Sequence, residues 1–315
     1  MAQPTNTFDT TDAVGIREDL INNIFNVDPD EVPFLSAMPK TTATATKHEW
    51  QTDQLDSPSD SNAHIEGDDT TAGAITPTVR LDNQCQILKK SYTITRTMER
   101  VDKAGRQKEH TYQAGLKAKA AKTDLEKSIF ANNAKVVRNS STAGEMAGAP
   151  AWLTTNTSAG GGGADPTGDG TDARTDGTQR AFTWDLLSGV LQSIWENSGV
   201  TPDAVYLGGH NKKVASGFTA ARSIEQDADG KRLTTAIDVF DYDFGEVRAV
   251  PSRHVRTRDA LVVNHGMWAC AELDAFKEEE LAKTGDARKF QIVGEYTIEC
   301  RNEKASGIVA DLTTS

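Results

Sequence analysis

The sequence predicts an α+β protein with a thin or elongated shape. Stretches with apolar residues at helical spacing are interspersed with short runs of alternating, β-branched residues, a mixture typical of such folds. With glycine counted in place of tyrosine, the apolar share of the 315 residues is about 43%, slightly below the ~45–50% usual in globular domains. We therefore expect a small core for a chain whose length corresponds to about two domains.

Residues 1–50 are expected to form an arm rather than a domain. A short amphipathic helix comes first, capped by Thr11 or Asp12 and ended before Pro29, because the residue preceding proline is disfavoured in a helix. Its apolar face carries Leu20, Ile21, Ile24 and Phe25. A second apolar patch at residues 32–38 is broken by prolines. So few apolar residues cannot form a core of their own, and the arm should pack on another surface.

Residues 51–84 are polar and rich in turn formers, such as Ser57-Pro58 and Glu66-Gly67. An unstructured connection of this length is unusual inside a compact domain. The flanking segments 44–52 and 78–95 have strand character, with threonine and β-branched residues in partial alternation. The pattern therefore favours a long projecting hairpin over a disordered segment.

One long helix is predicted over residues 97–137. Small and apolar residues form a narrow stripe at helical spacing, surrounded by lysines. The stripe consists of Ala114, Ala118, Ala121, Leu125, Ile129 and Asn132. Gly105 and Gly115 weaken the helix locally. At full length it would span about 60 Å, and its stripe should pack on a sheet.

Residues 139–180 are low in complexity, with a run of glycines at 160–163, which predicts a flexible surface insertion. Residues 181–274 then alternate helix and strand patterns and are expected to form a separate α+β domain. Its strongest element is an amphipathic helix at 183–198 that Gly199 ends. Strands at 290–300 and 307–312 are expected to return to the sheet under the long helix, which makes the first domain discontinuous in sequence.

Charge is unevenly distributed along the chain. The 34 basic and 46 acidic residues give a net charge of −12. Segments 1–86 and 139–315 are acidic, whereas segment 87–138 carries 13 basic and only 5 acidic side chains. A free nucleic-acid-binding protein would have a broad basic face, so this class is excluded. The basic segment could face nucleic acid, or acidic segments of the same or a neighbouring chain.

Composition excludes several other classes. The three cysteines, Cys85, Cys270 and Cys300, form no CxxC pair, so we expect neither a disulfide framework nor a zinc site. No apolar run is long enough for a membrane span. The N-terminus lacks a basic start and an apolar stretch, so no secretory signal is expected. Composition alone thus indicates a soluble cytosolic protein.

The chain lacks the common catalytic motifs. It has no GxSxG elbow, no HExxH pair and no phosphate-binding glycine loop. The histidines are scattered, at His48, His64, His110, His210, His254 and His265. A site assembled in space from such residues and aspartates stays an alternative, because a triad is recognised by geometry rather than by spacing. We expect no catalytic residue and no cofactor.

One stretch has the oxygen spacing of a calcium loop. Asp165, Thr167, Asp169 and Asp176 occupy ligand positions, and Gly170 occupies the turn position. Aspartate stands where the bidentate glutamate belongs, and the preceding glycines cannot form the first helix of such a site. An acidic surface loop is therefore the favoured interpretation.

The order of elements and several local motifs resemble a known family. The stretches Glu31-Val32-Pro33-Phe34-Leu35 and Glu49 to Leu55, together with the ending Gly294 to Glu299 and Asn302 to Ala305, resemble the head proteins of tailed bacteriophages. This resemblance implies a Johnson-type major capsid fold, which herpesvirus capsid floors and encapsulins share. By this resemblance, each segment is expected to correspond to one part of that fold. The parts are an N-terminal arm (1–50), an extended loop (51–84), a peripheral domain with a strand and spine helix (85–138), a Gly/Asp-rich flexible insertion (139–180), an axial domain (181–274) and returning peripheral strands (275–315).

The resemblance further implies a structural protein that assembles into hexamers and pentamers of an icosahedral head, located in the virion. The shell would enclose double-stranded DNA and contact it by non-specific attraction between opposite charges. Lys117, Lys119 and Lys122 are the candidate genome-facing residues. A separate scaffolding protein, a portal and cementing proteins are the expected partners, and no membrane is involved. An encapsulin-like compartment is the first alternative, and a cytosolic enzyme is the second.

Overall fold

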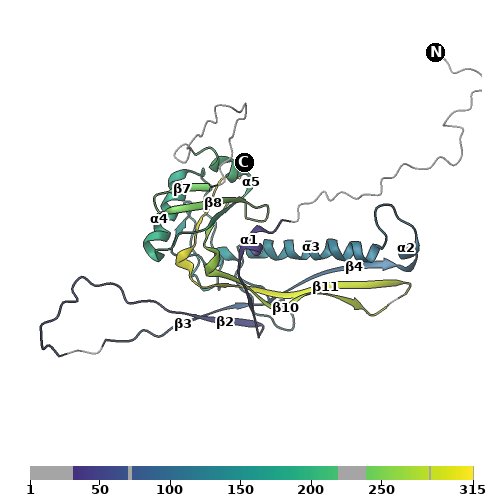
Figure 1. Cartoon of the computed structure of the whole chain (residues 1–315), viewed down its shortest axis with the longest axis horizontal. Coiled ribbons are helices and arrows are strands. Elements are labelled where there is room, and N and C mark those ends of the chain that lie inside the picture. Colours follow the sequence, from purple (N-terminus) through teal and green to yellow (C-terminus); the bar gives the residue numbers. More distant parts are fainter. Residues whose placement is uncertain (1–30, 70–72, 219–238, 284, 315) are drawn as a thin grey trace, which may run out of the picture.

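The computed structural model describes residues 31–69, 73–218, 239–283 and 285–314. These residues form an elongated molecule with two sheets and a separate two-stranded ribbon (Figure 1). The predicted helix at Leu20 to Phe25 lies outside the described residues. The apolar patch that follows forms the short helix α1 (Pro33–Ala37), with proline in the first turn, where its missing N–H leaves no bond unmade.

The longer sheet has four strands in the order β1-β10-β11-β4. Their bounds are β1 (Lys40–Thr42), β10 (Trp268–Leu281), β11 (Ala287–Cys300) and β4 (Gln86–Thr95). In β11, Phe290, Ile292 and Tyr296 are buried at alternate positions, as expected for a strand with one covered face. The predicted strand at 290–300 is therefore confirmed.

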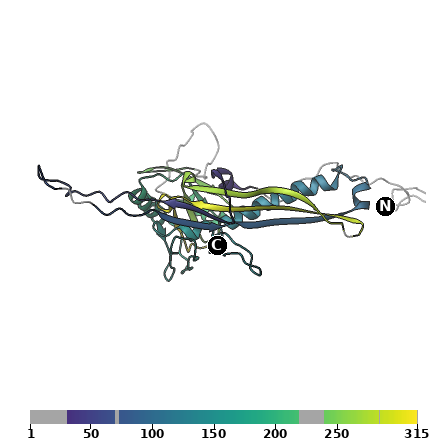
Figure 2. The same ribbon diagram turned by 90° about the horizontal axis from the view of Figure 1, so that it is seen from below.

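Helix α3 (Glu109–Ile129) packs on this sheet against β4 and β11 (Figure 2). Ala121, Leu125 and Ile129 of the predicted stripe are buried. The predicted 41-residue length is wrong. Thr95 caps a separate short helix, α2 (Arg96–Arg100), and the chain then turns through Gly105 with φ of +76°, a conformation that favours glycine. The 21 residues of α3 span about 32 Å.

The second sheet has six strands in the order β5-β12-β9-β6-β8-β7. Their bounds are β5 (Thr157–Ser158), β12 (Gly307–Val309), β9 (Ala260–Val263), β6 (Ala204–Leu207), β8 (Gly245–Pro251) and β7 (Val239–Tyr242). Helices α4 (Trp184–Ser198) and α5 (Gly209–Ala215) pack against it. The predicted α4 is confirmed, with Leu187, Leu191 and Ile194 buried. Three short 3-10 helices complete the described elements: η1 (Ala149–Trp152), η2 (His265–Met267) and η3 (Glu303–Ala305).

Two C-terminal strands lie in other sheets than predicted. β10 begins at Trp268 in the four-stranded sheet, although its first residues were expected in the 181–274 domain. β12 pairs with β9 and β5 in the six-stranded sheet, not under the long helix. Alternation reveals which face of a strand is buried but not which strand lies beside it.

The prediction that residues 139–180 are a flexible insertion is wrong. Ala147, Ala149, Ala151, Trp152 and Leu153 are completely buried. The glycines permit close approach: a Cβ on Gly148 would lie 1.8 Å from the carbonyl oxygen of Ala131. Glycine therefore serves packing here and does not indicate mobility.

The largest buried cluster lies where the two sheets meet. The Phe34 ring lies 5.0 Å from Tyr206, 5.3 Å from Phe130 and 6.2 Å from Trp268, measured between ring centroids. Glu126 of α3 is buried and accepts hydrogen bonds from the backbone N–H groups of Phe34 (2.9 Å) and Leu35 (2.7 Å). Burial raises the pKa of Glu126, while these two bonds oppose the rise. The carboxyl thus fastens α1 to α3.

Two alanine substitutions test whether the glycine-rich region is closely packed. Gly148→Ala should lower the free energy of unfolding by about 1–3 kcal/mol, the usual cost of overpacking. The matched control is Gly189→Ala in α4, where a Cβ meets nothing within 4 Å. It should raise stability by about 0.5–1 kcal/mol, because alanine is the better helix former. Urea unfolding measures both, and equal effects would contradict a packed segment.

Candidate functional site

A two-stranded ribbon projects from the molecule at the end opposite α2 (Figure 1). It consists of β2 (Lys47–Thr52) and β3 (Val79–Gln84), which pair antiparallel with Lys47 opposite Gln84 and Thr52 opposite Val79. This pairing confirms the strand character predicted for both flanks. Residues 53–69 and 73–78, called the ribbon loop below, form no regular secondary structure and are all exposed.

The ribbon loop combines negative charge with exposed apolar side chains. Leu55, Ile65 and Ile75 are 98%, 82% and 92% exposed. Residues 53–78 contain six acidic residues and no lysine or arginine. A segment that contacts no core of its own becomes ordered by binding a partner. The loop therefore has the composition of a binding segment.

Buried polar groups hold the base of the ribbon to the long sheet. Asn83 is fully buried, and its Nδ2 donates to the carbonyl oxygen of Ile298 at 3.0 Å. Its Oδ1 accepts from the backbone N–H of Ala147 at 2.9 Å. Trp50 Nε1 donates to the carbonyl oxygen of Cys300 at 2.9 Å. Replacing Asn83 with an apolar residue would remove the side-chain acceptor of the buried Ala147 N–H.

A lysine–aspartate ion pair and a histidine–glutamate contact flank these bonds. Lys135 Nζ lies 3.1 Å from Asp82 Oδ1 and donates to the Asp82 carbonyl oxygen at 3.0 Å. His48 Nε2 lies 2.5 Å from Glu299 Oε1. The base is thus fixed, while the loop beyond it is exposed. Sequence reasoning missed these anchors, although the polar run Asp82-Asn83-Gln84 within a predicted strand was a usable signal.

The three candidate lysines all lie on α3 but not on one face. Lys119 and Lys122 are exposed, and Lys117 is half-buried. At 100° per residue, Lys119 and Lys122 are about 60° apart around the helix axis, whereas Lys117 is about 140–160° from both. A single flat surface can therefore contact Lys119 and Lys122 together but not all three.

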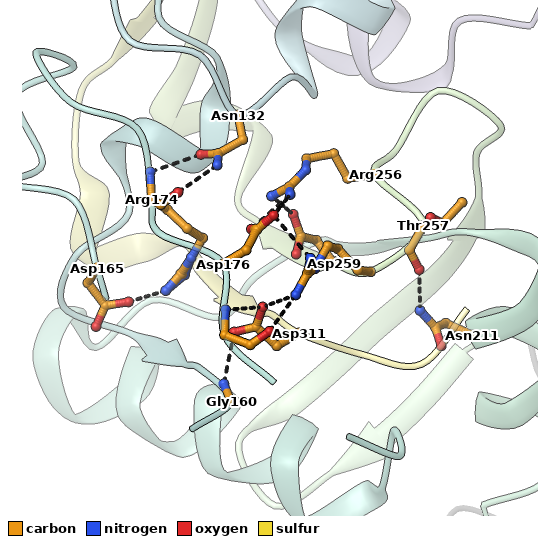
Figure 3. A network of polar contacts seen from close by, with 12 residues as sticks. Asn132, Gly160, Asp165, Arg174, Asp176, Asn211, Arg256, Thr257, Asp259 and Asp311 are labelled. Carbon is orange, nitrogen blue, oxygen red and sulfur yellow. Dashed lines mark hydrogen bonds and ion pairs between the residues drawn. The ribbon is translucent and has the colours of Figure 1, made fainter. Parts of the chain in front are cut away.

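The outer aspartates of the calcium-like stretch bind arginines (Figure 3). Asp165 pairs with Arg174, which is 3% exposed. Asp176 accepts from Arg256 Nη2 at 2.7 Å and from Arg258 Nη1 at 3.1 Å. The carboxylates of Asp165 and Asp176 thus form ion pairs with different arginine side chains.

The inner residues of the stretch bond to one another. Thr167 Oγ1 donates to Asp169 Oδ1 at 2.9 Å, and the backbone N–H of Thr171 donates to the same oxygen at 2.9 Å. Within the described ranges, no three acidic, histidine or cysteine side chains are grouped so as to hold a metal ion. The geometry is that of an internally bonded loop.

Asp311 fixes this loop to the six-stranded sheet (Figure 3). It is 1% exposed and accepts from the N–H groups of Gly160 (2.9 Å) and Gly177 (2.8 Å) and from Arg258 Nη2 (2.7 Å). These bonds, outweighing its burial, lower its pKa. Burial instead raises the pKa of nearby Asp259 to about 6, although the positive charge of Arg256 acts to lower that pKa.

One histidine lies in a chain of polar contacts. Tyr206 Oη is 2.8 Å from His265 Nε2, and His265 Nδ1 is 3.2 Å from Asp203 Oδ2. Burial lowers the pKa of His265 and raises that of Tyr206. The hydroxyl belongs to a residue that is only 1% exposed and packs on Phe34, so this chain of polar contacts borders the aromatic cluster. Among the described helices, none combines the length and apolar character needed to cross a bilayer.

The Asp259 carboxyl predicts a pH-dependent stability difference. Because its folded pKa is above the ordinary value of 3.8, the folded protein holds a proton that the unfolded chain has released. Its contribution to stability therefore falls as pH rises towards about 7. Between pH 5.5 and 8, Asp259→Asn should gain about 1 kcal/mol in unfolding free energy relative to wild type. Urea unfolding gives the profile, with the exposed Asp243→Asn as control; parallel profiles would contradict the assignment.

The chain matches known proteins along nearly its whole length. The family model described as SU10 major capsid protein matches residues 3–313. The major capsid protein of Escherichia phage Phieco32 is 27% identical over 352 aligned residues, which cover 98% of this chain and 97% of that protein.

Solved structures show the same fold. The capsid of Cyanophage P-SCSP1u has a TM-score of 0.60 at 13% identity, covering 95% of this chain and 94% of the other. The phage G structure of major capsid and decoration proteins has a TM-score of 0.56 at 11% identity, covering 99% and 100%. The predicted Johnson-type capsid fold is thereby confirmed. Since the family model spans nearly the entire sequence, this chain belongs to the SU10 major capsid protein family.

Proposed function

We propose that this chain, a major capsid protein that forms the head shell of a tailed phage, assembles as hexamers and pentamers in which the ribbon loop of each copy lies on a neighbouring copy. The exposure of the loop is the main support: every described residue between 53 and 78 is exposed. A loop without contacts in its own copy gains them in a shell of repeated subunits.

The segments then have distinct roles. Residues 1–50 serve as the arm and 51–84 as the extended loop. The four-stranded sheet with α3 forms the peripheral domain, which takes β10 from Trp268 onward. The six-stranded sheet forms the axial domain, which gains β12 and the packed segment 139–180.

The shell encloses double-stranded DNA and requires other proteins for its assembly. We expect a scaffolding protein and a portal, and decoration proteins of the kind that accompany the major capsid proteins of phage G. The role of the chain is structural, and we assign it no catalytic residue and no cofactor. DNA contact is assigned to α3, where Lys119 and Lys122 are exposed.

Shortening the ribbon loop tests the assembly proposal. Deleting residues 57–70 and closing the chain with Asn-Gly should leave the thermal stability of the free subunit nearly unchanged, because the described part of that stretch contacts no core. Shell formation, followed by light scattering and negative-stain microscopy with scaffold if required, should be lost or distorted. Wild type is the reference and must form shells. Normal shells from the deletion variant would show an ordinary surface loop.

Substitutions on α3 test DNA contact. Changing Lys117, Lys119 and Lys122 to glutamine should leave empty shells intact but weaken DNA retention, with a difference that shrinks as salt rises, since salt screens contacts to phosphate. Lys117→Gln alone is the matched control and should have the smaller effect because Lys117 lies on another side of the helix. DNA retention by filled particles is the readout. If shells fail before filling, the lysines instead contact acidic residues of neighbouring copies.

A further inference from the structure

The exposed surface of α3 is basic, although the chain as a whole is acidic. Within this helix, which is described throughout, the exposed residues are Thr111, Gly115, Lys119, Lys122 and Lys127. None of the three acidic residues of the helix is among them. Glu109 and Glu126 are buried, and Asp124 pairs with Lys90. The exposed side of α3 therefore carries positive charge only.

Four of the exposed residues lie on one side of α3. They are Thr111, Gly115, Lys119 and Lys122, and are called the α3 strip below. At 100° per residue they fall within about 80° around the helix axis, whereas Lys127 lies about 160° from Thr111. A Cβ on Gly115 would meet nothing within 4 Å. The middle of the strip is thus open to an approaching ligand.

A hollow lies at the N-terminal end of the α3 strip. It has a volume of about 390 Å³ and is lined by Arg106, Gln107, Lys108, Thr111 and Tyr112. Each of these side chains carries a hydrogen-bond donor, and none carries a carboxylate. Since Thr111 belongs to both the hollow and the strip, the two form one continuous surface.

Internal contacts hold one wall of the hollow in place. Arg106 pairs with the buried Glu109, and its guanidinium lies 5.2 Å from the centroid of the Tyr112 ring. Lys108 is exposed. Because Glu109 neutralises Arg106, Lys108 supplies the net positive charge of the hollow.

The chemistry of the strip and the hollow suits the backbone of DNA. Phosphate oxygens accept hydrogen bonds from lysine, arginine, hydroxyl and amide groups, and all four kinds of donor occur here. The centre of an interface between proteins is instead enriched in apolar and aromatic side chains. The exposed residues of α3 are threonine, glycine and lysine. Nucleic acid is therefore favoured over another protein as the occupant.

We propose that duplex DNA lies against the α3 strip, with one phosphate group seated in the hollow. This inference rests on the proposed function, in which the shell encloses DNA, and it names the surface of contact. Lys122 is about 16 Å from Thr111 along the helix axis, more than the ~12 Å width of the major groove. The two ends of the strip can thus contact phosphates of both strands that border one groove. Contacts to phosphate carry no sequence information, so the binding is independent of sequence.

A negative charge placed in the middle of the strip tests the contact. Gly115→Glu should weaken the binding of full-length, unassembled subunits to a short synthetic DNA duplex at least fivefold, because a carboxylate repels phosphate. The matched control is Gly189→Glu in α4, another exposed helical glycine whose Cβ would meet nothing within 4 Å. It should bind the duplex as wild type does. Fluorescence anisotropy at low salt measures both affinities.

Substitutions in the hollow test the phosphate seat. Lys108→Gln with Thr111→Val removes one charge and one hydroxyl, and should weaken duplex binding about threefold. The slope of log affinity against log salt should also fall by about one. Lys127→Gln removes the same charge on another side of α3 and should change the affinity less than twofold. Lys108→Arg keeps the charge and should bind as wild type does.

Shell formation separates this inference from the proposed function. The Gly115→Glu variant and the hollow variant should form empty shells as wild type does, but their filled shells should retain less DNA. If wild type forms no shells, the proposed function fails, whereas the duplex measurements on free subunits still decide this inference. Undiminished duplex binding by either variant, or no binding by wild type at low salt, would show the inference to be wrong. Variants that bind the duplex normally but form no shells would show that the surface contacts a neighbouring copy, which also overturns it.

Discussion

The aromatic contact between the two sheets is the interaction on which the rest of the structure depends. The four-stranded and six-stranded sheets share no strand pairing, and the rings of Phe34, Tyr206 and Trp268 fill the space between them. The chain has a modest share of apolar residues, and it concentrates the burial of apolar side chains at this junction. The long sheet, with α3 on one face, and the ribbon extend from it as thin projections.

Sequence patterns predicted the elements that carry local signals. The amphipathic spacing of Leu187, Leu191 and Ile194 located α4, and alternation in β11 located the returning strand, because each pattern follows from the geometry of one element. The paired strands of the ribbon were also predicted. The resemblance in the stretches around Phe34 and Trp50 led to the correct family, although no catalytic or ligand-binding motif was present.

Long-range packing was the part that the sequence did not predict. The apolar run from Met146 to Leu153 was a usable signal for a buried segment, but the surrounding glycines and aspartates outweighed it in composition. Asp165 and Asp176 matched the ligand spacing of a calcium loop. Their ion pairs with Arg174 and Arg256 become apparent only in the three-dimensional structure. The base anchors, such as Asn83, likewise join residues more than 60 positions apart.

The pairing of β5 with β12 has a consequence for the order of events during synthesis. Within the described sheet, Thr157 and Ser158 pair only with β12, whose residues are made about 150 positions later. Asp311, which holds Gly160 and Gly177, arrives with the same late segment. The nascent chain therefore cannot complete its six-stranded sheet until translation of this region is almost finished. A subunit without this late segment has no strand to pair with β5 and no Asp311 carboxylate to accept from the N–H groups of Gly160 and Gly177.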